Sequence, residues 1–143
     1  MTIIFRKQDL FAEAADALVN PVDCEGTLKG LGEEFRKRFP DNYKAFKRAA
    51  EKGELKVGRA FITQNIGEPM IINLPVKKRA KDPLMLDDVE KGLTDLARVL
   101  AENNIRSIAM PVIFDEVLKA DAGKGLAEKK LGVLQNIRII IIE

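Results

Sequence analysis

The chain has 143 residues, of which 46% are hydrophobic and 32% are charged, with a formal net charge of +2, a balance typical of one globular domain with its own core. No apolar run approaches the roughly 20 residues that span a bilayer, and the N-terminus lacks the features of a signal peptide, so we expect a cytoplasmic single domain over residues 1–143 with no membrane segment. One cysteine, Cys24, and no histidine offer neither an intramolecular disulfide, nor enough soft ligands for a zinc site, nor a Ser–His or Cys–His nucleophile pair.

The first third of the chain predicts two strands followed by two short helices. Residues 2–6 and 16–20 have the composition of strands, and the second strand is expected to end where Pro21 lacks a backbone donor. Apolar residues then recur at spacings of three and four on both sides of Pro40, which predicts two amphipathic helices, and Gly53 is expected to stop the second. The recurring residues are Leu31, Phe35 and Phe39, then Tyr43, Phe46 and Ala50.

The rest of the chain alternates between strands and helices. Residues 59–63 and 70–74 predict a hairpin with its turn at residues 65–69. A helix is predicted from an N-cap at Asp87, with Glu90 three residues on, to the pair Asn103 and Asn104. A buried strand at residues 107–112, an unassigned stretch, a helix at 126–134 and a strand at 137–142 complete the chain. Helices that recur between strands need sheet faces to cover, so we expect a three-layer α/β/α fold with a mixed central sheet.

The most informative local feature is a segment with three glycines between a buried strand and a helix. Gly26, Gly30 and Gly32 follow strand 16–20, and glycines allow backbone N–H groups to approach an anion closely. The following helix N-terminus adds unpaired donors and the positive end of its dipole. The spacing matches neither the Walker A nor the Rossmann fingerprint. On these residues alone, a phosphate-binding loop and a purely structural turn are equally well supported.

Several motifs together resemble the macro-domain family. They are Asp9-Leu10, the strand residues 17–23, the glycine loop, residues 35–40 (Phe-Arg-Lys-Arg-Phe-Pro), and Gly53 with Gly58. Residues 71–79, Ile-Ile-Asn-Leu-Pro-Val-Lys-Lys-Arg, resemble the Ile-Asn-Phe-Pro-Thr-Lys segment of the DarG-like branch, whose members are bacterial DNA ADP-ribosyl glycohydrolases that remove ADP-ribose from thymidine. The resemblance extends from Thr2 to the neighbourhood of Pro111.

The resemblance implies a cleft at the carboxyl ends of the strands that binds ADP-ribose or a related nucleotide without a metal or another cofactor. It implies that Asp9 accepts a hydrogen bond from the adenine amino group, and that residues 20–23, including Asn20 and Asp23, approach the distal ribose. Lys77 takes the place of the lysine associated with catalysis, where an ammonium group can stabilise charge on the departing base. The residues expected around the pyrophosphate are Gly26, Gly30, Leu31 and Gly32. A cap, turn glycines and a solvated lysine are the structural alternatives for these positions.

Some positions depart from the family pattern. Asp23 stands where the family generally has Asn, so a carboxylate that can only accept replaces an amide. Glu25 places a second carboxylate in the loop expected to hold a diphosphate. Where macro domains carry a second glycine-rich phosphate loop, residues 112–119 read Val-Ile-Phe-Asp-Glu-Val-Leu-Lys, and Gly123 with Gly125 could be displaced remnants of it. A Val/Ile/Phe run lacks the unhindered backbone of a glycine loop, and Asp115 with Glu116 would repel phosphate if they faced the cleft.

Three functions follow as hypotheses. The first is a hydrolase that uses Lys77 to release ADP-ribose from a macromolecule such as DNA. Residues 29–59 hold ten Lys/Arg against five Asp/Glu, a cluster that would guide a polyanion or would simply be a solvated helix surface. The second is a module that binds ADP-ribose or a related nucleotide without turning it over. The third is a degenerate domain that serves as a protein-interaction scaffold, because fold alone licenses no activity.

Overall fold

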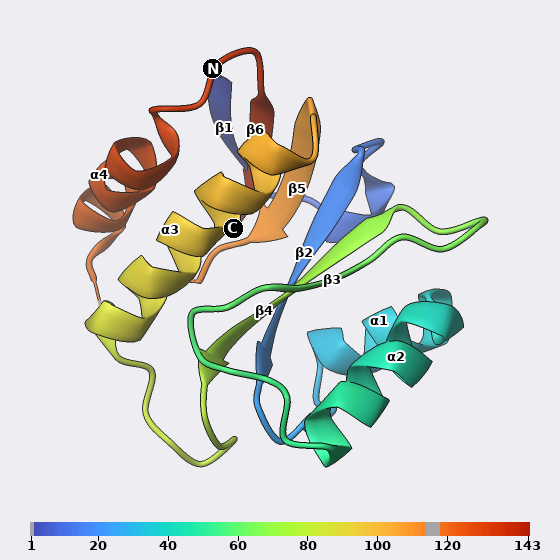
Figure 1. Cartoon of the computed structure of the whole chain (residues 1–143). Helices are drawn as coiled ribbons and strands as arrows, with labels where there is room; N and C mark the ends of the chain where they lie inside the picture. The colour runs from blue at the N-terminus through green and yellow to red at the C-terminus, as the bar shows by residue number, and fades with distance from the viewer. Residues whose placement is uncertain (1, 114–117) are drawn as a thin grey trace.

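The computed structural model describes residues 2–113 and 118–143, which build a mixed sheet with helices on both faces (Figure 1). The strands are β1 (Thr2–Arg6), β2 (Ala17–Asp23), β3 (Phe61–Thr63), β4 (Met70–Lys77), β5 (Ser107–Pro111) and β6 (Arg138–Ile142). The helices are the 3₁₀ turn η1 (Leu10–Ala12), α1 (Leu31–Arg38), α2 (Pro40–Glu51), α3 (Leu86–Glu102) and α4 (Ala120–Leu131). The predicted three-layer α/β/α architecture with a mixed central sheet is confirmed. Within the described ranges, no helix combines the length and apolar character needed to cross a bilayer.

The order of the strands across the sheet is β1-β6-β5-β2-β4-β3. Neighbouring strands pair in parallel except β3, which pairs antiparallel with β4 at one edge and confirms the predicted hairpin. Helices α3 and α4 lie on one face, while α1 and α2 lie on the other (Figure 1). Because β2, β4 and β5 are parallel, the segments that leave their carboxyl ends emerge at the same edge of the sheet.

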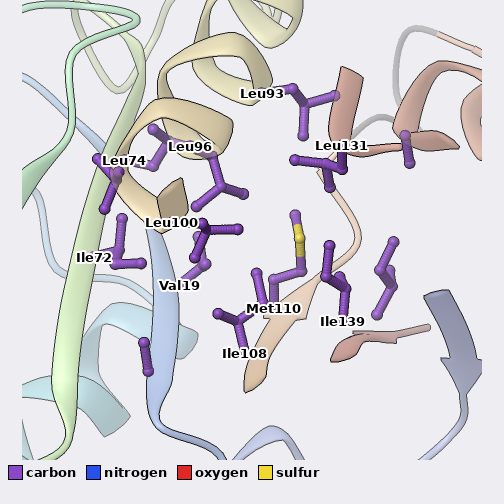
Figure 2. Packing of buried hydrophobic residues seen from close by; sticks show 14 of the residues in the cluster. Val19, Ile72, Leu74, Leu93, Leu96, Leu100, Ile108, Met110, Leu131 and Ile139 are labelled. Atoms are coloured by element: carbon purple, nitrogen blue, oxygen red, sulfur yellow. The ribbon is translucent and has the colours of Figure 1, made fainter. Parts of the chain in front are cut away.

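The core follows the two-residue period of the strands, which sends successive side chains to opposite faces. On one face, residues of β2, β4, β5 and β6 pack against α3 and α4 in a single apolar cluster (Figure 2). The labelled members are Val19, Ile72, Leu74, Leu93, Leu96, Leu100, Ile108, Met110, Leu131 and Ile139. The intervening residues Leu18, Ile71, Ala109 and Ile140 form a second cluster on the other face with Phe35 of α1. The sheet is therefore covered on both sides.

The prediction that Pro21 ends its strand is wrong, because β2 continues to Asp23. Strand β5 pairs with β2 only at Ala17 and Leu18. At Pro21 there is therefore no β5 strand to which a backbone N–H group would have to donate, so the proline is tolerated. On the other side, Pro21 keeps its register with Leu74 of β4. The additional strand residues 21–23 carry β2 to the edge of the sheet where the candidate site lies.

Two predicted helix starts are also wrong. Helix α3 begins at Leu86 after Met85, without a side-chain cap, and Asp87 instead lies in its first turn, where a carboxylate favours the helix dipole. Helix α4 spans Ala120–Leu131 rather than 126–134, so Gly123 and Gly125 are helical residues and not remnants of a phosphate loop. Ala127 and Leu131 anchor α4 in the core, and this packing overrides the low helix propensity of the two glycines.

The remaining strand boundaries differ by a few residues from the predicted ones. Strand β3 begins at Phe61 rather than 59, and β4 extends to Lys77 rather than 74. Strand β5 ends at Pro111 and β6 begins at Arg138, one residue inside each predicted limit. The longer β4 matters for the candidate site, because it includes Lys77, the lysine selected in the sequence analysis.

Candidate functional site

A crevice of about 440 Å³ opens at the carboxyl ends of β2, β4 and β5. The pairing of β2 with β5 ends at Leu18 and Ala109. The helix that follows β2, α1, lies on one face of the sheet, and the helix that follows β5, α4, lies on the other (Figure 1). Such a divergence of neighbouring parallel strands is a topological switch point, where open α/β sheets bind their ligands. The volume lies within the range of about 300–1,000 Å³ that is usual for small-molecule sites.

The structure brings several of the predicted site residues into this crevice and leaves others outside its lining. Those that line it are Asn20, Asp23, Leu31, Gly32 and Lys77. Asp9, Gly26 and Gly30 do not line it. The exposed Asp9 instead caps η1, where its Oδ1 accepts a hydrogen bond from the Phe11 N–H at 3.1 Å. An adenine contact at Asp9 stays a prediction.

Gly26 and Gly30 shape the loop from behind. Gly26 has φ of +75°, and an added Cβ would lie 2.9 Å from the Cβ of Ala50 in α2. Gly30 has φ of +55° at the N-cap of α1, with open space around it. Both residues have a backbone conformation that residues other than glycine seldom adopt. Their observed roles are close packing and turn geometry.

Two carboxylates brace the loop. Asp23 Oδ1 accepts hydrogen bonds from the backbone N–H groups of Glu25 at 2.9 Å and Thr27 at 3.2 Å. Glu25 Oε1 accepts one from the Ala80 N–H at 3.0 Å, which ties the loop to the segment after β4. We expected Glu25 to compete with a bound anion, whereas the structure gives its carboxylate a partner within the protein. The acceptor-only Asp23 likewise suits two N–H donors.

The backbone donors that remain are those of residues 28–31. The N–H groups of residues 24–27 and 32–34 donate within the loop, to β4 or into the first turn of α1. By contrast, the N–H groups of residues 28–31 donate to no acceptor in the described part of the chain. They lie at the start of α1, where the helix dipole adds positive potential. Glu33 and Glu34 in this turn are paired with Arg36 at 2.7 Å and Arg38 at 3.3 Å, which offsets their charge.

Lys77 reaches the crevice through an irregularity in the sheet. Val22 pairs with Pro75, but the next residue, Asp23, pairs with Lys77, so one residue of β4 is skipped. Bulges of this kind redirect side chains and are common beside active sites. Lys77 is half-buried and forms no ion pair with any carboxylate in residues 2–113 or 118–143. Its ammonium group is therefore available to a ligand as far as the described residues show.

Comparison with known proteins identifies the fold. A family model described as the Macro domain matches residues 19–125. The chain belongs to the macro-domain family. The resemblance predicted from the sequence is thereby confirmed.

Relatives of this macro domain include the proteins named DNA ADP-ribosyl glycohydrolase from Mycobacterium tuberculosis and Thermus aquaticus. Each is 38% identical to it, over 113 and 111 residues respectively. The matches cover 76% and 75% of the chain but 32% and 31% of the relatives, so the chain spans about a third of their length.

The same similarity holds in three dimensions. The macrodomain of Thermus aquaticus DarG has a TM-score of 0.90 and 32% identity, with 99% of this chain and 98% of that chain covered. The macrodomain of Mycobacterium tuberculosis DarG has a TM-score of 0.89 and 31% identity, covering 99% and 97%. Thermosipho africanus DarTG in complex with ADP-ribose has a TM-score of 0.87 at 21% identity, covering 99% and 42%, and shares the fold.

The described start of the second loop, residues 111–113, is apolar. Pro111, Val112 and Ile113 line the crevice, and Ile113 is only 6% exposed. These residues form an apolar wall, and among the described residues they leave a crevice of about 440 Å³. The predictions for Phe114, Asp115 and Glu116 fall outside the described residues.

The single cysteine of the macro domain lies beside the site but is poorly suited to nucleophilic attack. Burial raises the pKa of the Cys24 thiol, and the neighbouring Asp23 carboxylate raises it further against an opposing effect of Lys78. The thiol is therefore protonated at neutral pH, and only the thiolate is a strong nucleophile. Among the described residues, no three His, Cys, Asp or Glu side chains gather to hold a metal ion.

The sequence did not point to three residues that α1 and α2 contribute to the crevice, Arg36, Asn42 and Tyr43. Their periodicity places them on helices, but which helix face meets the crevice depends on how α1 and α2 dock on the sheet. The sequence does contain a pattern from which the hydrogen bonding of the buried strand asparagines could have been predicted. Asn20 and Asn73 interrupt apolar strand sequences, and a polar residue there must find a partner.

Proposed function

We propose that this macro domain binds ADP-ribose in the crevice at the carboxyl ends of β2, β4 and β5 and removes it from DNA by hydrolysis. The observation that carries the proposal is that Asn20 and Lys77 line one crevice with Leu28, Lys29 and Leu31, whose backbone N–H groups donate to no acceptor in the described residues. Its support from relatives is the 38% identity to proteins named DNA ADP-ribosyl glycohydrolase. As part of the proposal, residues 1–143 act as a single domain, in the cytoplasm where bacteria keep their DNA.

The crevice offers a different chemistry for each part of the ligand. The pyrophosphate would lie against the N–H groups of Leu28, Lys29 and Leu31 at the positive end of α1, because backbone donors and the helix dipole both favour an anion. The distal ribose would lie at Asn20, whose amide can bond a hydroxyl group. The bond to the nucleobase would then lie towards Lys77, on the neighbouring strand β4.

Lys77 would act by electrostatic stabilisation. In the hydrolysis, the bond between the anomeric carbon of the distal ribose and the base nitrogen breaks, and its electron pair leaves with the base. Water supplies a hydroxyl group to that carbon and a proton to the base. An ammonium group close to the departing base stabilises the negative charge that develops on it, a role that needs no histidine.

Positive side chains around the crevice suit a nucleic-acid substrate. Lys29 lines the crevice together with Lys77, and the exposed Lys78 and Lys81 follow β4. Clustered cations attract the phosphate backbone irrespective of base sequence. ADP-ribosylated DNA is therefore the macromolecular substrate that we propose.

A second candidate function is binding of ADP-ribose or a related nucleotide without turnover. The apolar wall formed by Val112 and Ile113 favours it, because those side chains stand where a glycine loop would let backbone donors close over the ligand. Such a site would still hold the pyrophosphate at residues 28–31. Turnover is the property that separates the two candidates.

Calorimetric titration with ADP-ribose tests the site itself. We expect saturable binding by the wild-type chain, and no binding at millimolar ligand would leave only a role as a protein-interaction scaffold. The second measurement is release of ADP-ribose from DNA modified on thymidine. We expect Lys77→Ala to lower the rate about 10²- to 10³-fold, as loss of one charge-stabilising group does elsewhere.

Lys129→Ala is a matched control for that experiment. It removes the same charge from an exposed position on α4, away from the crevice lining, and should leave the rate unchanged. Binding without release by the wild type would favour the non-catalytic module. Equal rates for wild type and Lys77→Ala would remove Lys77 from the reaction.

A further inference from the structure

Three buried asparagine side chains connect the crevice to the strand and helix behind it. Asn20 of β2, Asn73 of β4 and Asn42 of α2 are 4%, 0% and 2% exposed. Asn20 and Asn73 are register partners in neighbouring strands, so their side chains share the face that α1 and α2 cover. Asn20 and Asn42 line the crevice, whereas Asn73 lies between them and does not.

The amides are linked in a chain of hydrogen bonds. Asn20 Nδ2 donates to Asn73 Oδ1 at 3.1 Å, and Asn42 Nδ2 donates to the same oxygen at 3.3 Å. Asn73 Nδ2 donates in return to Asn42 Oδ1 at 2.8 Å, and Thr63 Oγ1 donates to that oxygen at 2.6 Å. The amide groups therefore constrain one another's orientation.

A backbone carbonyl group fixes the orientation of the three amide side chains. Asn73 Nδ2 also donates to the carbonyl oxygen of Phe61 in β3 at 3.0 Å, and a main-chain oxygen can only accept. The nitrogen of the Asn73 amide must therefore face Phe61, and its oxygen must face Asn20. It follows that Asn20 has to present its own nitrogen to Asn73.

This orientation of the amides leaves an oxygen of Asn20 without a partner in the described part of the chain. Asn73 accepts a hydrogen bond from one of the two N–H groups of Asn20, and the buried Asn20 Oδ1 has no hydrogen-bond partner among the described residues. A buried acceptor without a partner is costly, so a ligand donor that reaches this oxygen from the crevice, which Asn20 lines, would gain affinity. A phosphate oxygen, which is also an acceptor, would be repelled there.

We propose that Asn42 and Asn73 are positioning residues that hold the Asn20 amide with its oxygen towards the ligand. In this orientation, the position at Asn20 selects a sugar hydroxyl and rejects a phosphate. The inference rests on the proposed ADP-ribose site and adds how that site sets the register of its ligand. A reversed Asn20 amide would offer N–H groups and would accept a phosphate at the same place.

The test compares ADP-ribose with ADP, which shares the adenosine diphosphate part and lacks the distal ribose. For wild type and Asn73→Ala, calorimetry gives the ratio of the two affinities. We expect Asn73→Ala to lower the preference for ADP-ribose about five- to tenfold, the loss of one oriented hydrogen bond, while affinity for ADP changes little. An unchanged preference in a folded Asn73→Ala protein would overturn the proposal.

Thr63→Val is the matched control. It removes the outermost hydroxyl of the same cluster, but Asn73 keeps both Phe61 and Asn42 as acceptors, so the preference should be retained. If Asn73→Ala fails to fold, Asn42→Ala serves in its place, because it removes one of the two acceptors that orient Asn73. A smaller fall in the preference is then expected, and an unchanged preference contradicts the proposal.

A double-mutant cycle separates positioning from general loosening of the core. Asn20→Ala removes the acceptor itself, so adding Asn73→Ala to it should cause no further loss of preference if Asn73 acts through Asn20. Additive losses would show that Asn73 acts by another route. If the wild type binds neither ligand, the proposed function fails. If it prefers ADP-ribose and the variants do so equally, only the positioning role fails.

Discussion

Asp95 links α3 to the segment just before β3 through a side-chain hydrogen bond. Its Oδ2 accepts a hydrogen bond from the Ala60 N–H at 2.7 Å, just before β3, and its Oδ1 is 2.7 Å from Arg98 Nε. The Asp95 side chain is 10% exposed. Burial pushes the pKa of this carboxyl upward, but the hydrogen bonds from Arg98 and Ala60 outweigh it, so the pKa lies below its ordinary value.

This depressed pKa predicts a pH dependence of stability. An Asp that is more acidic in the folded state stabilises the fold fully above its unfolded pKa of about 3.9, and that contribution disappears as pH falls through the folded pKa. Asp95→Asn should therefore lower the free energy of unfolding at pH 7 by about 1–2 kcal/mol, and the deficit should shrink below about pH 4. Urea denaturation of both proteins from pH 7 down to well below about pH 4 measures it. Glu128→Gln, at an exposed position on α4, is the control. A deficit that stays constant across the range would contradict this account.

Single residues also show what a sequence can and cannot reveal about a site. The functional assignments of Lys77 and Asn20 depended on a family resemblance, and the structure brings both into the crevice. The partners of Asn20 could not be predicted in the same way, because Asn73 is 53 residues away and Asn42 is 31 residues from Asn73. Similarly, the Ala60 partner of Asp95 belongs to a segment 35 residues away. Hydrogen bonds of this kind depend on strand order and helix docking.

At the scale of elements, periodicity identified helices and strands well and their ends less well. The period of α3 was clear because its apolar stripe faces the core, whereas the first two turns of α4 contain two glycines and few apolar residues. Helix propensity alone places the start of α4 too late. The packing of Ala127 and Leu131 in the core decides where this helix forms, and that packing is a tertiary property.

The glycines inside helices give a prediction for stability. Gly125 is exposed in α4, and an added Cβ would meet nothing within 4 Å, so Gly125→Ala should raise the free energy of unfolding by about 0.5–1 kcal/mol through helix propensity. Gly92 of α3 is the matched comparison, because its added Cβ would lie 3.4 Å from Cδ2 of the buried Leu74. Gly92→Ala should gain less or lose stability as Leu74 adjusts. Denaturation midpoints of the two variants test this, and an equal gain at both sites would contradict the packing argument.

For the whole molecule, the location of the site could be predicted only in outline. The family resemblance implied a cleft at the carboxyl ends of the strands. Its opening depends on the early divergence of β2 and β5, which follows from the order β1-β6-β5-β2-β4-β3. The last strand of the chain, β6, lies between β1 and β5 in that order. Such non-local pairing leaves no local pattern in the sequence.

Because the crevice combines β2, β4, the end of β5 and helices α1 and α2, it exists only when the sheet and helices are assembled. A ligand bound there must therefore stabilise the whole fold. At a free ADP-ribose concentration 100 times its dissociation constant, the free energy of unfolding should rise by about 2.7 kcal/mol. Urea denaturation across a ligand titration measures this rise.

Lys77→Ala provides the internal comparison for that titration. If Lys77 acts mainly on the departing base, the variant should show nearly the same stabilisation as the wild type at the same free ADP-ribose concentration, although its rate of ADP-ribose release is much lower. Calorimetric binding without any rise in stability would mean that ADP-ribose also binds the unfolded chain, which is incompatible with a site assembled from several elements.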